Sequence, residues 1–171
     1  LQVISGGVNI AQAKGVTMSS AATGTTTGDK CVDGSTAVDN TNEVCQTNTE
    51  QKPWIRIDLG GLYRVDSVVI FNMMDGPAAP NPRTAGLSLE LLNEGFLANS
   101  VHVLSGAATE VIQVEAKDAA KCGIRYVRVD ATNEVINMRE VMVMRNGVNL
   151  ALSKPSTMSS DNNANSGGQP R

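Results

Sequence analysis

This chain is poor in aromatic residues and has no cluster of basic residues and no long apolar run. Aromatic residues make up 3% of its 171 residues, and 14 lysines and arginines stand against 17 aspartates and glutamates. The net charge of −3, with no basic cluster, argues against nucleic acid as a partner. No apolar run approaches the roughly 18 residues that a membrane-spanning helix needs, so membrane insertion is not expected.

Residue types for catalysis and zinc binding are also scarce. His102 is the only histidine, and none of the three cysteines forms a CxxC pair, so a zinc site is disfavoured. No serine or cysteine nucleophile has a histidine nearby. The carboxylates gather in a polar loop and do not form a pair flanking an apolar cleft. We therefore expect a protein that is not an enzyme, with His102 on the surface of a strand.

The chain does contain a repeat. Gly7-Val8-Asn9-Ile10-Ala11 returns as Gly147-Val148-Asn149-Leu150-Ala151, at an offset of 140 residues. Thr17-Met18-Ser19-Ser20 returns as Thr157-Met158-Ser159-Ser160 at the same offset. This period suits a complete domain better than a solenoid repeat of roughly 20–50 residues. The sequence thus predicts a string of domains.

The repeat also extends backwards, because Leu1-Gln2-Val3-Ile4 stands opposite Val141-Met142-Val143-Met144. We therefore predict that residues 1–6 are the last strand of a preceding repeat, residues 7–146 one domain, and residues 147–171 the start of the following repeat. Segment 1–6 is expected to pair with the preceding unit or with a neighbouring chain. The near absence of a linker predicts that successive domains are held close together.

Short strands separated by turns dominate the pattern. Apolar and polar residues alternate, as in strands with one buried face, at 55–59, 87–91, 127–129 and 141–144. Val68-Val69-Ile70-Phe71 is continuously apolar, as expected of a strand covered on both faces. Turn signals separate these runs at Gly60-Gly61, Asp75-Gly76-Pro77, Asn93-Glu94-Gly95 and Ser105-Gly106. Many short strands with frequent turns predict a β-sandwich.

Four pieces of sequence follow one another at domain spacing. They are residues 9–14 with 17–20; Cys31-Val32-Asp33-Gly34-Ser35; residues 53–60 with 65–70; and residues 125–129 with 139–141. Together they resemble the discoidin family, also called the coagulation-factor type C domain, and its fucose-binding F-type lectin relatives. The resemblance implies an all-β, eight-stranded jelly-roll β-sandwich that acts as an extracellular binding module, mostly for carbohydrate. Trp54 is expected to pack in the core or on the sheet; a sugar-stacking role is the alternative.

The resemblance also implies a calcium site in the polar loop between residues 29 and 49. This loop mixes carboxylates with neutral oxygens, which are the ligands that calcium uses. In calcium-binding relatives an Asp-Gly turn and a glutamate before the last strand hold the ion. Carried over, these ligands are the Asp33 side chain, the Lys30 and Ser35 carbonyl oxygens, and Glu140. The alternative is that Asp33 only forms a turn and Glu140 is an exposed charge.

Fucose-binding relatives use one histidine and two arginines, and this sequence departs from that pattern. Thr47 stands at the histidine position, Met73 at the first arginine position, and only Arg83 fits the second. Met73 cannot hold a sugar hydroxyl as an arginine does, so fucose recognition of the family type is not expected. Met73 and Met74 can instead offer a soft apolar surface to a partner. If a glycan binds, we expect Thr47, Asn72 and Arg83 to contact it, with Arg83 as the main donor.

Two of the three cysteines, Cys31 and Cys45, bracket the polar loop with 13 residues between them. A disulfide there would stabilise the fold by roughly 3 kcal/mol in the chain-entropy model. We expect this pair to be bonded in an oxidising compartment. Cys122 is then left over, either buried or bonded to another chain.

Three functions remain open. The first is an extracellular carbohydrate-binding or adhesion module of a tandem-repeat surface protein, with a glycan or a neighbouring repeat as its partner. The second is a structural building block of an extracellular fibre or cell-coat array. The third is a binding module appended to a glycan-active enzyme. The many serine, threonine, asparagine and glycine residues suit an extracellular or cell-surface location.

Overall fold

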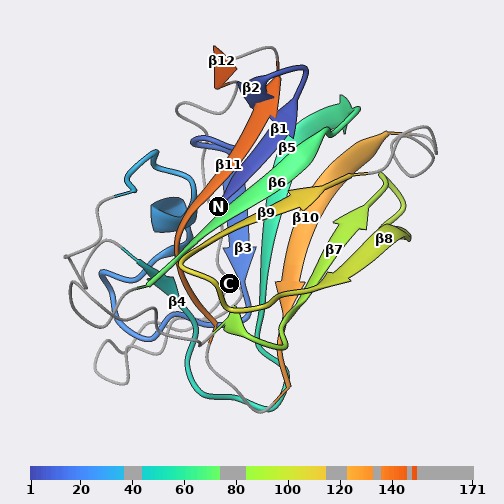
Figure 1. Cartoon of the computed structure of the whole chain (residues 1–171). Helices are drawn as coiled ribbons and strands as arrows, with labels where there is room; N and C mark the ends of the chain where they lie inside the picture. Colours follow the sequence, from blue (N-terminus) through green and yellow to red (C-terminus); the bar gives the residue numbers. More distant parts are fainter. Residues whose placement is uncertain (37–43, 74–83, 115–122, 133–135, 146–147, 150–171) are drawn as a thin grey trace, which may run out of the picture.

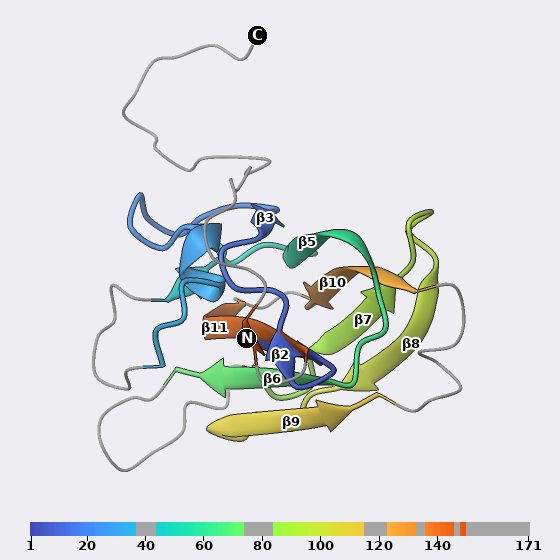
Figure 2. The same cartoon turned by 90° about the horizontal axis from the view of Figure 1, so that it is seen from above.

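The structure, a computed structural model, describes residues 1–36, 44–73, 84–114, 123–132, 136–145 and 148–149. These residues form two β-sheets that lie face to face, and Figure 2 shows the sheets as separate layers. Within the described ranges the only helical segment is one 3-10 turn, η1 (Gly28–Cys31). The expected all-β sandwich is therefore confirmed. No helix among the described residues has the length and hydropathy needed to cross a membrane.

The larger sheet has seven strands in the order β12-β11-β2-β1-β6-β9, with β4 paired to β11 at the side. The strands are β1 (Gln2–Ser5), β2 (Val8–Asn9), β4 (Cys45–Gln46), β6 (Ser67–Asn72), β9 (Thr109–Gln113), β11 (Asn137–Arg145) and β12 (Val148–Asn149). β6 lies in the middle of this sheet, where it pairs with β1, β9 and β11.

The smaller sheet has five strands in the order β3-β5-β10-β7-β8, all antiparallel to their neighbours. They are β3 (Gly15–Met18), β5 (Trp54–Tyr63), β7 (Ser88–Leu92), β8 (Ala98–Val103) and β10 (Ile124–Asp130). The alternation predicted from sequence decides which face is buried. Ile55 and Ile57 point into the core with no exposed surface, while Arg56 and Asp58, which alternate with them, are only partly buried.

The hydrophobic core fills the space between the two sheets. Each sheet contributes aliphatic side chains with at most 1% exposed surface, chiefly Leu1, Val3, Val68, Ile70, Ile55, Ile57, Leu59, Leu89, Leu91, Val127 and Val129. Burial of this apolar surface is the main force that holds the sandwich together.

Two details of the expected strand pattern are wrong. Val69 and Phe71 on β6 keep part of their surface exposed, so this strand is fully covered on one face only. Gly60-Gly61 does not end a strand but lies inside β5, where the register with β10 shifts by a bulge. A bulge bends a strand without ending it, which explains why a turn signal stands in the middle of a strand here.

Segment 1–6, expected to pair with a preceding unit or a neighbouring chain, pairs within this chain. β1 runs antiparallel to β6 and parallel to β11 (Figure 1). Leu1 and Val3 have no exposed surface. The segment has the sequence of a last strand, but it packs as an interior strand of this domain.

Candidate functional site

An open pocket lies where β10 ends and β7 begins. Figure 1 shows these two strand ends at the lower end of the five-stranded sheet. Its volume is about 320 Å³, and it is lined by Ala85, Gly86, Leu87, Ser88, Asp130, Ala131 and Thr132. Asp130 is the Cα partner of Ser88 on β7 and, on its other side, of Trp54 at the start of β5. The pocket therefore combines polar residues on paired strand ends with a rim made from loops.

Asp130 is held by an arginine on its own strand. The Nε and Nη2 groups of Arg128 both donate to Asp130 Oδ1, at 2.9 Å and 2.5 Å. The Arg128 guanidinium also lies over the Trp54 ring, 5.3 Å from the ring centroid. Asp130 Oδ2 is buried and accepts no hydrogen bond from the residues that the structure describes. Because a buried acceptor without a donor is costly, this oxygen marks an unused hydrogen-bonding position beside the pocket.

Aromatic residues, scarce in the sequence, gather on the outer face of the five-stranded sheet, and one of them, Trp54, is the Cα partner of the pocket residue Asp130. The guanidinium carbon of Arg56 lies 5.5 Å from the Trp54 ring centroid, 4.9 Å from that of Phe96 and 5.4 Å from that of Tyr126. Phe96 stacks on Tyr126 with the ring centroids 4.5 Å apart. Cation–π contacts of this kind hold rings and guanidinium groups in fixed orientations. Trp54 therefore packs on the outside of the sheet and not in the core.

Arg125, on the same sheet, is engaged by carboxylates. Its Nε lies 3.2 Å from Asp58 Oδ1 and its Nη1 lies 2.8 Å from Glu94 Oε1. The hydrogen bond and the charge of Asp58, followed by the hydrogen bond of Glu94, raise the pKa of Arg125. By contrast, the described part of the chain places no carboxylate in a salt bridge with Arg56.

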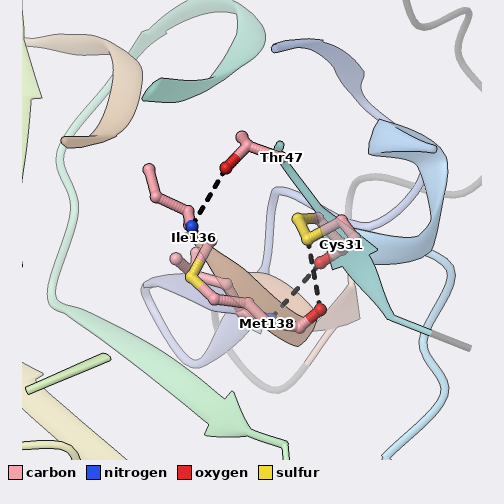
Figure 3. The surroundings of a disulfide bond; sticks show 6 residues. Cys31, Thr47, Ile136 and Met138 are labelled. Atoms are coloured by element: carbon pink, nitrogen blue, oxygen red, sulfur yellow. Dashed lines mark hydrogen bonds between the residues drawn. A yellow bond between two sulfur atoms is a disulfide. The ribbon is translucent and has the colours of Figure 1, made fainter. Parts of the chain in front are cut away.

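Thr47, expected to contact a ligand, is wholly buried. Its N–H donates to the Ile136 carbonyl at 2.9 Å, and its Oγ1 accepts the Ile136 N–H at 3.0 Å (Figure 3). Thr47 thus connects the loop after β4 to the segment that leads into β11 by two hydrogen bonds. The ligand contact expected of Thr47 does not fit this burial.

Asn72, the second expected ligand contact, is also buried and has a structural role. It has 1% exposed surface and ends β6. Its N–H donates to the Ala108 carbonyl at 2.9 Å, and its Nδ2 donates to the Gly106 carbonyl at 3.1 Å. A Cβ added to Gly106 would lie 2.8 Å from the Cβ of Ala85, which lines the pocket. Asn72 therefore positions a turn that supports the pocket wall.

Arg83, the third expected ligand contact, lies outside the described residues. The structure resumes at Thr84, which is buried and whose carbonyl accepts the Leu87 N–H at 3.2 Å. Arg83 is two residues before the pocket residue Ala85 in sequence. Met73 has only 7% exposed surface, so the suggestion that it offers an apolar surface to a partner is wrong. Met74 is outside the described residues.

The expected calcium ligands lie around η1 and β11. Asp33 Oδ1 accepts the Ser35 N–H at 2.9 Å, which is an Asx turn. Asp33 Oδ2 lies 3.9 Å from Lys30 Nζ. Glu140 lies on β11 opposite Phe71, and its side chain is outside what the structure describes. η1, which contains Lys30, contacts β11, which contains Glu140, and Asp33 follows η1 by two residues.

These residues fit calcium only in part. Among the described residues no three His, Cys, Asp or Glu side chains are close enough to hold a metal ion. One carboxylate and several carbonyl oxygens are an acceptable partial set for calcium. However, the Lys30 ammonium competes for the Asp33 carboxylate, so an ion would have to displace this lysine.

A disulfide joins Cys31, at the end of η1, to Cys45, at the start of β4 (Figure 3). Both residues are wholly buried, and their Cα atoms are 5.2 Å apart. The Cys45 sulfur lies 3.2 Å from the Met138 carbonyl oxygen, because β4 pairs with the first residues of β11. The bond therefore ties the polar loop to the last long strand. Cys122 is outside the described residues.

The sequence interpretation missed Ser88, Asp130 and Thr132 as site residues. One signal was present: buried Val127 and Val129 alternate with Arg128, which puts Arg128 and Asp130 on the same face. The pairing of Asp130 with Trp54 comes only from the register of β10 and β5.

Comparison with known proteins supplies the family and the relatives. The model of the NedA-like, galactose-binding domain family matches residues 30–133. The lectin domain of lectinolysin, solved in complex with Lewis B antigen, is 29% identical with a TM-score of 0.68, covering 80% of this chain and 96% of that chain. A search of curated protein sequences gives no match.

Two further solved structures have the same fold. The fucolectin from striped bass (Morone saxatilis) serum is 27% identical with a TM-score of 0.62, and the match covers 80% of this chain and 48% of that chain. A Streptococcus pneumoniae fucose binding module is 23% identical with a TM-score of 0.68, covering 82% and 96%.

Proposed function

We propose that this chain, which belongs to the NedA-like, galactose-binding domain family, is a glycan-binding module whose ligand lies over the pocket between β10 and β7. The observation that carries the proposal is the grouping of Trp54, Arg128 and Asp130 on paired strand ends beside that pocket. The structures that it resembles are lectin and binding modules, so we propose no catalytic activity for it.

The pocket lining, together with Trp54 and Arg128 beside Asp130, offers three kinds of contact that suit a sugar. The flat apolar ring of Trp54 can cover the C–H face of a sugar ring while its polar edge stays in water. Arg128 presents planar donors, and Asp130 accepts hydrogen bonds from hydroxyl groups as a charged acceptor. The hydroxyls of Ser88 and Thr132 can donate or accept. Arg83, two residues before Ala85 in sequence, is proposed as a further donor.

The sugar differs from the fucose that some relatives bind. The lectinolysin lectin domain was solved with Lewis B antigen, the striped bass protein is a fucolectin, and the Streptococcus pneumoniae structure is a fucose binding module. This chain has Thr47 and Met73 where fucose-binding relatives place a histidine and an arginine, and both side chains are buried. We therefore propose a hydroxyl-rich glycan recognised without the fucose-type contacts.

The proposed setting is an extracellular or cell-surface protein. The Cys31–Cys45 disulfide supports this location, because disulfides persist in oxidising compartments. A tandem array would raise the avidity of individually weak sites, since linked sites bind the same surface together. Calcium bound by Asp33 and Glu140 is the proposed cofactor.

A glycan array probed with the full chain tests the proposal and identifies the sugar class. Asp130→Asn should then weaken binding at least about tenfold, which corresponds to roughly 1.4 kcal/mol. The matched control is Asp29→Asn, the same change at an exposed position on η1, and it should leave binding unchanged. Undiminished binding by Asp130→Asn would place the site elsewhere.

Arg83→Ala is the second test variant, and it should abolish binding with little change in the thermal midpoint. Failure of the unmodified chain to bind any glycan would remove the proposal altogether. The structural-array function would then take its place, and a separate observation favours it: two segments that repeat in the sequence are neighbouring strands in the sheet.

A further inference from the structure

The 140-residue period of the sequence reappears as a pairing between strands. β1 and β11 run parallel, with Gln2 opposite Met142 and Val3 opposite Val143. Each pair differs by 140, because 142 − 2 and 143 − 3 both equal 140. Two segments that are equivalent in sequence therefore lie next to each other in one sheet, as Figure 1 shows for β1 and β11.

The strand that follows each segment repeats as well. β1 pairs with β2, and β11 pairs with β12, through Cα partners that again differ by 140: Ile4↔Asn9 and Ser5↔Val8 in the first hairpin, Met144↔Asn149 and Arg145↔Val148 in the second. Gly6-Gly7 connects the first pair with positive φ angles of 55° and 82°. In sequence, Asn146-Gly147 stands at this place, and both dipeptides favour two-residue hairpin turns. The two segments thus share one hairpin register.

β1 and the end of β11, the two repeated segments, would occupy the same position beside β6. β11 pairs with β6 as far as Met142 opposite Val69. One more step of this antiparallel register would put Val143 opposite Val68. That position is held by Val3, which is Val68's partner on β1. β1 therefore pairs with β6 in the register that the end of β11 would have if its pairing with β6 continued.

The position beside β6 is built to receive core side chains. Leu1, directly before β1, and Val3 on β1 have no exposed surface. Without them the core between the sheets would be incomplete, and buried cavities are destabilising. In the second copy Val141 and Val143 stand at the corresponding positions in the sequence. Both are apolar and β-branched, so the second copy has residue types suited to the same place.

We propose that the edge of β6 at residues 67–69 is an acceptor site for residues 141–145 of another copy of this domain. Successive copies are then joined head to tail by a shared strand, whose first part lies in the sheet of one copy and whose last part lies in the sheet of the next. In this chain β1, which has the equivalent sequence, occupies the acceptor site. The inference is independent of glycan binding, since the pocket is lined by the end of β10 and the start of β7. Figure 1 shows these strand ends at the opposite end of the sandwich from the start of β6.

The first test asks whether β1 or the end of β11 occupies the acceptor site in the full chain. Two double variants are made in a Cys122→Ser background: Val3→Cys with Val68→Cys, and Val143→Cys with Val68→Cys. After mild oxidation, mass mapping should find a disulfide in the first variant and at least about tenfold less in the second. The reverse result would show that each domain fills the site with its own last strand, and would overturn the proposal.

The second test asks whether the site accepts the strand of another copy. The acceptor chain carries Val68→Cys with Val3→Lys, which puts a charge at a wholly buried position and displaces β1. The donor chain carries Val143→Cys and keeps its own β1. Mixing and oxidising the two should give a covalent heterodimer joined through these two cysteines.

Two further acceptors make the second result decisive. Val3→Ile, which leaves β1 in place, should give at least about tenfold less heterodimer than Val3→Lys. Val3→Gly weakens β1 without adding a charge and replaces Val3→Lys if the lysine variant loses its β-sheet circular dichroism. Equal yields with the isoleucine acceptor, or no heterodimer with a folded glycine or lysine acceptor, would overturn strand sharing between copies.

Discussion

The Thr47 hydroxyl oxygen accepts a hydrogen bond from the Ile136 N–H, 3.0 Å away and across 89 residues of sequence. Both residues are wholly buried. The bond joins the loop after β4 to the segment before β11, and so connects two separate loops at one end of the sandwich. A threonine at the position of a sugar-binding histidine therefore has a structural role here.

Thr47→Val should lower the free energy of unfolding by about 1–3 kcal/mol, because it keeps the side-chain shape and leaves a buried N–H without its acceptor. Amide hydrogen exchange should show that Ile136 loses protection. Thr47→Ser is the matched control, since it keeps the oxygen, and Ile136 should stay protected. Protection retained in the valine variant would contradict this role.

Gly106 and Gly86 have nearly the same left-handed backbone conformation, with φ angles of +82° and +80°. Alanine at Gly86 meets nothing within 4 Å, so its cost should be that of the left-handed backbone alone, about 1–2 kcal/mol. Alanine at Gly106 must also displace Ala85, so its cost should be clearly larger. Urea unfolding of both variants measures the difference, and equal costs would mean that the contact with Ala85 relaxes freely.

Removing the disulfide should destabilise the chain. Cys31→Ser combined with Cys45→Ser should lower the free energy of unfolding by about 3 kcal/mol in the chain-entropy model. Cys122→Ser controls for the loss of a thiol and should not reproduce this effect. A reducing agent should shift the unfolding midpoint of the unmodified chain but not that of the double variant. Equal sensitivity of both would assign the effect to another cysteine.

Calcium should raise the thermal midpoint, because an ion bound only by the folded state adds to its stability. Excess chelator should lower the midpoint of the unmodified chain and leave Asp33→Asn unaffected. Lys30→Gln should increase the calcium effect, because it removes the ammonium that lies 3.9 Å from Asp33. A midpoint that does not respond to chelator would exclude a stabilising calcium site.

The fold could be predicted from sequence because its strands are amphipathic. The alternation of Ile55 and Ile57 with Arg56 and Asp58 fixes which face of β5 is buried, whatever its neighbours are. The turn at Asn93 was equally local, since its side chain accepts the N–H groups of Gly95 and Leu97. The sequence pattern is sufficient for such elements.

The candidate site could be predicted only in part, because burial depends on partners distant in sequence. Thr47 and Asn72 are polar and stand at family ligand positions, yet each is enclosed by a loop that no local pattern reveals. Asp130 was not predicted as a site residue, because no local sequence pattern sets it apart. Its importance comes from lying between Trp54 and Ser88, and strand register alone shows that.

The parallel pairing of β1 with β11 has a mechanical consequence. If the start of β1 and the end of β11 are pulled apart, the two strands slide along each other, and the hydrogen bonds between them, which run across the strands, carry the load together. A pair loaded in this way resists force better than a hairpin that opens one bond at a time. Forced unfolding depends on the unfolding barrier rather than on equilibrium stability. A domain of this kind is therefore suited to bearing tension along its chain.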